Sequence, residues 1–98
     1  MSVVQKMQLV VLISGRGSNL QAILDQAASG SLSAKVAAVI SNRFGVYGLE
    51  RARQAGVPAL ELDHKDFADR SGFEAALIEM IDRYQPDLVV LAGFMLVL

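Results

Sequence analysis

Apolar residues follow two different spacings along this chain. Four short runs rich in Val, Leu and Ile predict strands, at residues 9–13, 36–40, 58–62 and 87–92. Between these runs, apolar positions recur with the helical period and predict three helices, at residues 18–29, 47–55 and 72–84. Gly30 and Gly56 follow the first two helical stretches, where glycine commonly ends a helix.

The alternation of strands and helices predicts an α/β fold. Parallel strands joined by helices require right-handed crossovers, so we expect a Rossmann-like parallel sheet of four strands in the order 3-2-1-4 with three helices. Pro58 opens the third strand, as an edge strand tolerates. Residues 1–6 lack either pattern and are predicted to form an N-terminal extension, which leaves residues 7–98 as one domain.

The stretch from Leu88 to Leu98 contains only apolar residues and glycine. It is too short to span a bilayer, which takes about 20 apolar residues. We expect a buried parallel strand in its first part and, after Gly93, an apolar segment that further protein covers. If uncovered, this segment would favour self-association of the chain.

The turn between the first strand and the first helix is the strongest sign of a ligand site. It reads Ser14-Gly15-Arg16-Gly17-Ser18-Asn19, and its two glycines let the backbone approach a ligand closely. The unpaired amides of a helix's first turn and the positive end of the helix dipole favour an anion there. The turn therefore predicts a phosphate site.

The common nucleotide motifs do not fit this turn. The dinucleotide fingerprint needs a third glycine where Leu20 stands. It also needs an acidic residue at the end of the second strand, which carries Ser41-Asn42-Arg43 instead. The Walker-type loop needs a Lys-Ser or Lys-Thr pair, and the turn has none. Neither a dinucleotide nor a Walker-bound nucleotide is therefore expected.

What remains is a small phosphate monoester held by Gly17, Ser18 and Asn19. We expect valine at position 17 to block the approach of this ligand without unfolding the protein. The alternative is that Ser18 only caps its own helix, with Gln21 completing a capping box.

The composition limits the other classes of function. The chain has 98 residues, a formal net charge of -1 and no cysteine. Scattered charges of both signs argue against a nucleic-acid surface, and a chain without cysteine has no disulfide framework or thiolate metal site. Residues 1–6 contain no signal-peptide core, so we expect a cytoplasmic protein with no metal, no nucleic-acid partner and no membrane partner.

Three stretches of the sequence resemble one enzyme family. They are residues 10–23, which contain Ser-Gly-Arg-Gly-Ser-Asn-Leu-Gln, residues 48–52, which read Gly-Leu-Glu-Arg-Ala, and residues 86–95, which read Pro-Asp-Leu-Val-Val-Leu-Ala-Gly-Phe-Met. In this order and spacing they resemble the phosphoribosylglycinamide formyltransferases, the folate-dependent enzymes of purine synthesis. The related formyltetrahydrofolate hydrolases share the fold and are an alternative, but they are not expected to keep the first stretch.

The resemblance implies a function for the whole enzyme. Members of this family transfer a formyl group from 10-formyltetrahydrofolate, a co-substrate, to glycinamide ribonucleotide in de novo purine biosynthesis. The similarity covers the N-terminal half of such a formyltransferase domain, whereas the family's catalytic Asn-His-Asp set lies in the C-terminal half. No residue of this chain is therefore expected to be catalytic, the chain alone is expected to be inactive, and the C-terminal half is its implied partner.

The resemblance also places both ligands on this half. The ribonucleotide phosphate would lie on the loop residues Gly17, Ser18 and Asn19. The folate would lie against Arg70 and along the last four residues, Met95, Leu96, Val97 and Leu98. A guanidinium suits the carboxylate of the folate's glutamate end through paired hydrogen bonds. The family is expected to have arginine where this chain has Leu96, so a contact on the benzoyl-glutamate side would be lost.

Other readings of the sequence concern His64 and Asp63. His64 is the single histidine, and its charged neighbours favour a solvated loop over a catalytic role. Asp63 follows the third strand and invites comparison with a receiver-like signalling module, but such a module needs paired acids where Ser14-Gly15 stand. A non-catalytic phosphate-binding domain is the remaining alternative.

Overall fold

The computed structural model describes residues 7–43 and 45–94 and contains the predicted succession of strands and helices. The strands are β1 (Met7–Ile13), β2 (Ala34–Ser41), β3 (Ala59–Glu61) and β4 (Leu88–Leu91). The helices are α1 (Ser18–Ser29), α2 (Tyr47–Gln54) and α3 (Arg70–Asp82), and a short 3-10 turn spans His64–Asp66. The predicted extension at residues 1–6 lies outside the described residues.

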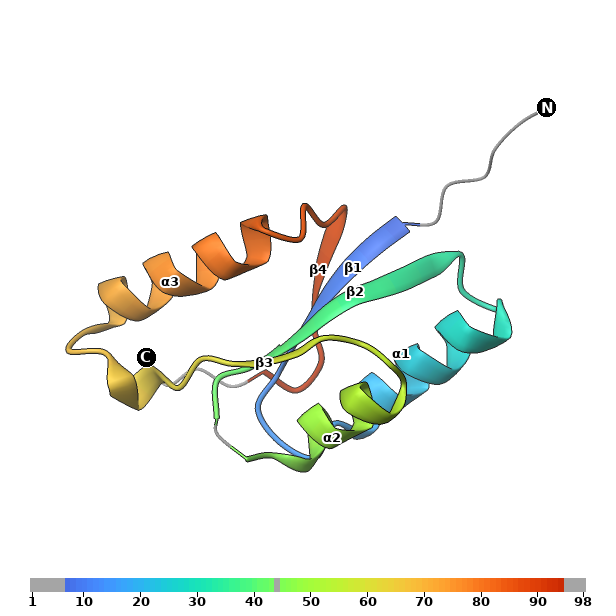
Figure 1. Cartoon of the computed structure of the whole chain (residues 1–98), viewed down its shortest axis with the longest axis horizontal. Coiled ribbons are helices and arrows are strands. Elements are labelled where there is room, and N and C mark those ends of the chain that lie inside the picture. The colour runs from blue at the N-terminus through green and yellow to red at the C-terminus, as the bar shows by residue number, and fades with distance from the viewer. Residues whose placement is uncertain (1–6, 44, 95–98) are drawn as a thin grey trace.

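The strands form one parallel sheet in the order β3-β2-β1-β4 (Figure 1). The predicted Rossmann-like fold class and strand order are therefore confirmed. The register between β1 and β2 shifts once, because Leu9 pairs with Val36 while Val10 pairs with Ala38. This leaves one extra residue in β2, a β-bulge that the apolar run at residues 36–40 does not reveal.

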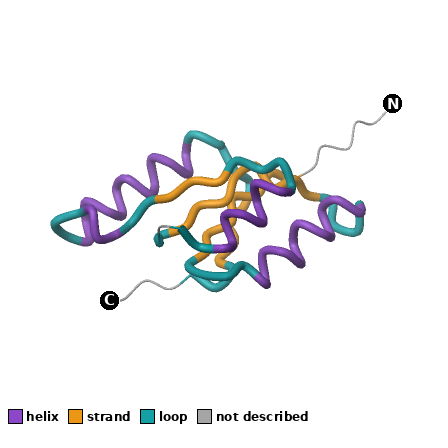
Figure 2. The backbone as a smooth tube through the Cα atoms, turned by 60° about the horizontal axis from the view of Figure 1, so that its bottom comes forward, coloured by secondary structure: helices purple, strands orange, loops and turns teal. Residues whose placement is uncertain are grey.

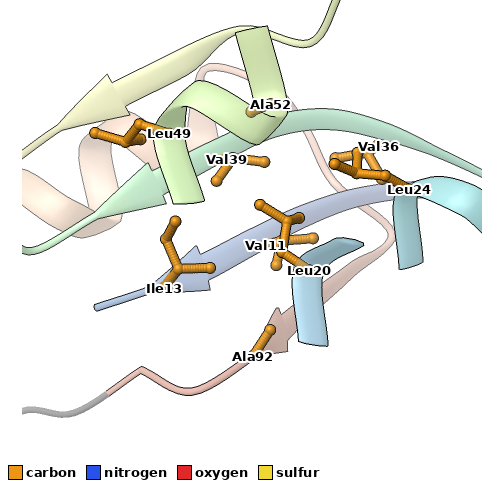
Figure 3. Packing of buried hydrophobic residues seen from close by; sticks show 9 residues of the cluster. All are labelled: Val11, Ile13, Leu20, Leu24, Val36, Val39, Leu49, Ala52 and Ala92. Carbon is orange, nitrogen blue, oxygen red and sulfur yellow. The ribbon is translucent and has the colours of Figure 1, made fainter. Parts of the chain in front are cut away.

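Helices cover both faces of the sheet. Helices α1 and α2 lie on one side of the strands and α3 on the other, and Figure 2 shows the strands between them. Successive side chains of a strand alternate between faces, so β1 contributes to both cores. The core under α1 and α2 is shown in Figure 3 and consists of Val11, Ile13, Leu20, Leu24, Val36, Val39, Leu49, Ala52 and Ala92. The core under α3 is centred on Val10, Leu12, Ala38 and Ile40.

The helix ends follow local capping signals. Helix α1 spans the predicted residues and ends at Gly30, whose φ of +82° lies in the left-handed region. Helix α3 begins two residues before the predicted start at Gly72, because Asp69 caps it by accepting a hydrogen bond from Gly72 N at 2.8 Å. It ends at Asp82 instead of Tyr84. Its predicted apolar stripe does face the protein, through Phe73, Leu77, Met80, Ile81 and Tyr84.

Strand β4 is an edge strand, and the prediction that it is buried is wrong. Leu88, Val89 and Leu91 are 51%, 38% and 66% exposed. Among the described residues only β1 pairs with β4, so neither its second edge nor its outward side chains are covered. Val90 is the one residue of β4 that packs against the α1–α2 core. An apolar run in a sequence does not distinguish a central strand from an uncovered edge strand, which is why the prediction failed.

Candidate functional site

The predicted phosphate loop joins the carboxyl end of β1 to the start of α1. Gly17 directly precedes α1 with a φ of +78°, in the left-handed region that favours glycine. The first helical hydrogen bond runs from Gln21 N to Gly17 O at 2.8 Å. The amides of Ser18 and Asn19 come before this bond and have no partner within the helix. The structure thus brings the three predicted phosphate residues together where a helix presents unpaired donors.

The capping-box alternative is wrong. Gly17 and not Ser18 occupies the N-cap position, and no side chain caps α1, all of which is described. The Gln21 side chain donates to Asp25 Oδ1 at 2.9 Å and accepts from Arg51 Nη1 at 3.1 Å. The first turn of α1 also contains no acidic residue. The positive end of the helix dipole is therefore not neutralised by a carboxylate of this turn and favours an external anion.

Helix α2 supports the loop through close backbone packing. Gly48 N donates a hydrogen bond to Gly15 O at 3.1 Å. A Cβ added at Gly17 would lie 2.7 Å from Gly48 Cα, and one added at Gly48 would overlap the Cδ1 atom of Ile13. Both glycines are thus needed for the contact between the loop and α2. Valine at position 17 would therefore strain the fold itself, contrary to the expectation from sequence.

A buried polar pair joins the ends of β1 and β2 beside the loop. Ser14 Oγ donates to Asn42 Oδ1 at 2.7 Å, and both residues are buried. Asn42 N also donates to Ile13 O at 3.3 Å. Buried polar groups require such partners, so the serine that follows β1 is matched by the asparagine that follows β2. Sequence reasoning noted only that this position lacks an acid and missed the pairing.

Arg51 of α2 is a cation beside the loop that sequence reasoning also missed. Its Nε donates to Arg16 O at 2.7 Å, and its guanidinium lies 4.7 Å from the centre of the Tyr47 ring. The stretch Gly-Leu-Glu-Arg-Ala at residues 48–52 contributes to the family resemblance, but the sequence alone predicts no role for its arginine. The helical period alone does not tell which side of α2 meets the loop, so the contact required the structure.

The predicted folate residues are described only in part. Arg70 is the first residue of α3, and its Nε donates to Glu74 Oε1 at 2.6 Å in an ion pair in which both side chains are about half exposed. Met95, Leu96, Val97 and Leu98 lie outside the described residues. The folate role of all five residues stays a prediction. His64 begins the 3-10 turn that precedes α3.

A groove of about 650 Å³ lies at the other end of the sheet. It is lined by the first residues of β1 and β2, the second half of α1, the segment before β3 and the two residues that follow α3. Ligands of open parallel sheets bind beyond the carboxyl ends of the strands, so this groove is distinct from the predicted site. Within residues 7–43 and 45–94, no cluster of His, Asp and Glu is suited to a metal ion, and no helix has the length and apolar character to cross a membrane.

A comparison with protein families settles the class of this chain. The profile of the formyl transferase family matches residues 7–98. The chain belongs to the formyl transferase family. Phosphoribosylglycinamide formyltransferase of Escherichia coli is 51% identical to this formyl transferase chain over 92 residues, which cover 94% of the chain and 43% of the relative. The trifunctional purine biosynthetic protein adenosine-3 of Drosophila melanogaster is 48% identical over 96 residues, 96% of the chain and 7% of the relative.

A solved structure agrees with this assignment. Glycinamide ribonucleotide transformylase 1 from Symbiobacterium toebii matches with a TM-score of 0.90 and 50% identity, over 95% of this formyl transferase chain and 44% of that one. The chain thus spans less than half the length of these bacterial relatives. None of the three relatives is named as a hydrolase or a signalling module, so these two alternatives gain no support.

Proposed function

We propose that this chain takes part in formyl transfer from 10-formyltetrahydrofolate to glycinamide ribonucleotide in purine biosynthesis, and that it supplies the binding site of the ribonucleotide phosphate. The observation that carries the proposal is the loop of Gly17, Ser18 and Asn19 at the start of α1, in a chain of the formyl transferase family. A relative named phosphoribosylglycinamide formyltransferase, 51% identical, supports the same acceptor substrate.

The chemical contribution of this chain would be binding and orientation. In the proposed reaction the amine of the ribonucleotide attacks the formyl carbon of the folate, and proton transfers complete the exchange. Amides at the start of α1 that hold the phosphate fix the other end of the ribonucleotide, so the amine meets the formyl group in one orientation. Such positioning contributes up to about 7–11 kcal/mol to catalysis in favourable systems.

The folate would lie near Arg70 and the last four residues of the chain, Met95, Leu96, Val97 and Leu98. The pair between Arg70 and Glu74 is half exposed, and surface pairs of this kind are worth less than about 1 kcal/mol. A folate carboxylate would therefore displace Glu74 from the guanidinium at little cost. Two parallel hydrogen bonds to the fork of arginine would favour this exchange.

We infer that the uncovered edge of β4 pairs with the C-terminal half of the same domain. Leu88, Val89 and Leu91 are exposed there, and an unpaired apolar edge is a template for another strand. The bacterial relatives are more than twice as long as the part that matches this chain, so they contain further protein for such an interface. Without it, the same edge is expected to drive self-association.

Leu91→Lys should lower the self-association of the chain, because a charge on an edge strand opposes edge-to-edge pairing. Sedimentation velocity at micromolar concentration measures the effect. Ile78→Lys is the matched control, since Ile78 is similarly exposed at 58% but lies on α3. A monomeric parent chain, or an equal effect of both variants, would show that the β4 edge is not the associating surface.

Glycinamide ribonucleotide should shift the backbone amide signals of Gly17, Ser18 and Asn19 in a nuclear magnetic resonance titration, because these donors would bind its phosphate. Glycinamide riboside, which lacks the phosphate, is the matched ligand and should bind at least about tenfold more weakly, since each hydrogen bond to a charged group contributes about 1.5–3 kcal/mol. Equal affinities, or shifts confined to residues around the opposite groove such as Val57, would contradict the proposed function.

A further inference from the structure

The carbonyl groups of the phosphate loop are turned toward α2. Gly15 O accepts from Gly48 N at 3.1 Å, and Arg16 O accepts from Arg51 Nε at 2.7 Å. In a planar trans peptide the carbonyl oxygen and the following amide hydrogen point in opposite directions. The amides of Arg16 and Gly17 therefore point away from α2. Successive amides turned to one side form an anion-binding concavity, which here leads into the first turn of α1.

Arg51 stabilises this arrangement through three contacts. Besides the bond to Arg16 O, its Nη1 donates to Gln21 Oε1 on α1 at 3.1 Å, and its guanidinium stacks on the Tyr47 ring of α2 at 4.7 Å. Gln21 is in turn fixed by Asp25, to which it donates at 2.9 Å. The guanidinium thus connects the loop, α1 and α2, and its planar fork is suited to two acceptors at once.

We propose that Arg51 is a positioning residue of the phosphate site, which keeps the Arg16 carbonyl away from the anion so that the loop amides face it. This inference rests on the proposed function and deepens it. The positive charge of Arg51 lies next to the loop and adds attraction for a phosphate dianion. A carbonyl released from Arg51 would be free to turn toward the anion and repel it. Both the hydrogen bond and the positive charge of Arg51 therefore contribute to phosphate affinity.

The test compares the affinity of four forms of the chain for glycinamide ribonucleotide. Arg51→Gln should weaken binding by about tenfold or more, the loss expected for a charged hydrogen-bond partner. Arg51→Lys keeps the charge but lacks the fork that reaches both Arg16 O and Gln21 Oε1, so it should recover only a small part of the affinity. Arg53→Gln is the matched control, because Arg53 is two positions away and pairs with Glu50 and Glu61 instead of the loop.

The outcomes separate this inference from the proposed function. Full affinity of Arg51→Gln, or full rescue by Arg51→Lys, would overturn the positioning role while the ligand assignment stands. Failure of the parent chain to bind the ribonucleotide would overturn the proposed function. The positioning role is then decided without ligand, by amide hydrogen exchange. The Gly48 amide, which donates to Gly15 O beside the Arg51 contact, should exchange faster in Arg51→Gln and Arg51→Lys than in Arg53→Gln, and equal rates would overturn the positioning role.

Discussion

Replacing Gly17 by valine should lower the free energy of unfolding by about 2–6 kcal/mol, the sum of backbone strain at a left-handed position and overpacking against a neighbour. The φ of Gly17 is +78°, where a β-branched residue is a rare outlier. Its new Cβ would lie 2.7 Å from Gly48 Cα, which belongs to the backbone and yields only if α2 moves. The loss is a large part of the roughly 5–15 kcal/mol that stabilises a typical domain.

Denaturant unfolding followed by circular dichroism measures this loss. Gly15→Ala is the matched control in the same loop, because a Cβ at Gly15 meets no atom within 4 Å and its φ is not positive. Alanine there should be neutral or stabilising by up to about 1 kcal/mol, since it restricts the unfolded chain. If both variants change stability equally, the packing of Gly17 on Gly48 is not what requires glycine.

The 98-residue chain alone should transfer no formyl group above the uncatalysed background, because the resemblance implies a catalytic Asn-His-Asp set in the half of the domain that this chain does not match. General acid–base catalysis typically contributes about 10²–10⁴-fold to a rate, and without it the proton transfers go unassisted. Addition of the C-terminal half of the Escherichia coli relative, which is 51% identical over the matching part, should restore transfer. The measurement is the rate at which formylglycinamide ribonucleotide forms, with and without 10-formyltetrahydrofolate.

The control for this assay is the same mixture in which the histidine that the resemblance implies to be catalytic is replaced in the added half. Activity should disappear in that mixture even though the two halves still associate. Turnover by the purified chain alone, made in a host that lacks its own enzyme, would show that the catalytic residues lie within these 98 residues. That result would move the active site to this half.

The sequence predicts the elements of this fold well because each is marked by a local signal. Gly30 ends α1 where expected, and the apolar runs identify all four strands. The failures concern contacts distant in sequence. Whether β4 is covered depends on what pairs with its second edge, and the shift between Leu9 and Val10 depends on two strands meeting. Neither is encoded in a single run of residues.

In the candidate site, too, local features are predictable from the sequence, whereas contacts between distant residues are not. The phosphate loop follows from two glycines, a strand and a helix that are contiguous in the chain, so the sequence predicts it. Arg51 is 35 positions away from Arg16 and reaches it only because α2 packs on the start of α1. The capping alternative arose because Ser18 is a common capping residue, but the tight turn places Gly17 at the N-cap position.

The two helical layers differ in how firmly they are held. Helices α1 and α2 bury Leu20, Leu24, Leu49 and Ala52 against β1 and β2, whereas α3, which the structure describes in full, buries only Phe73. Local unfolding starts where few apolar contacts are buried, so α3 belongs to the part that opens first. The predicted phosphate loop lies between β1 and α1, on the side with more buried apolar contacts. We therefore expect the loop to keep its geometry when α3 detaches and re-forms, so that an anion would bind to a loop that is already ordered.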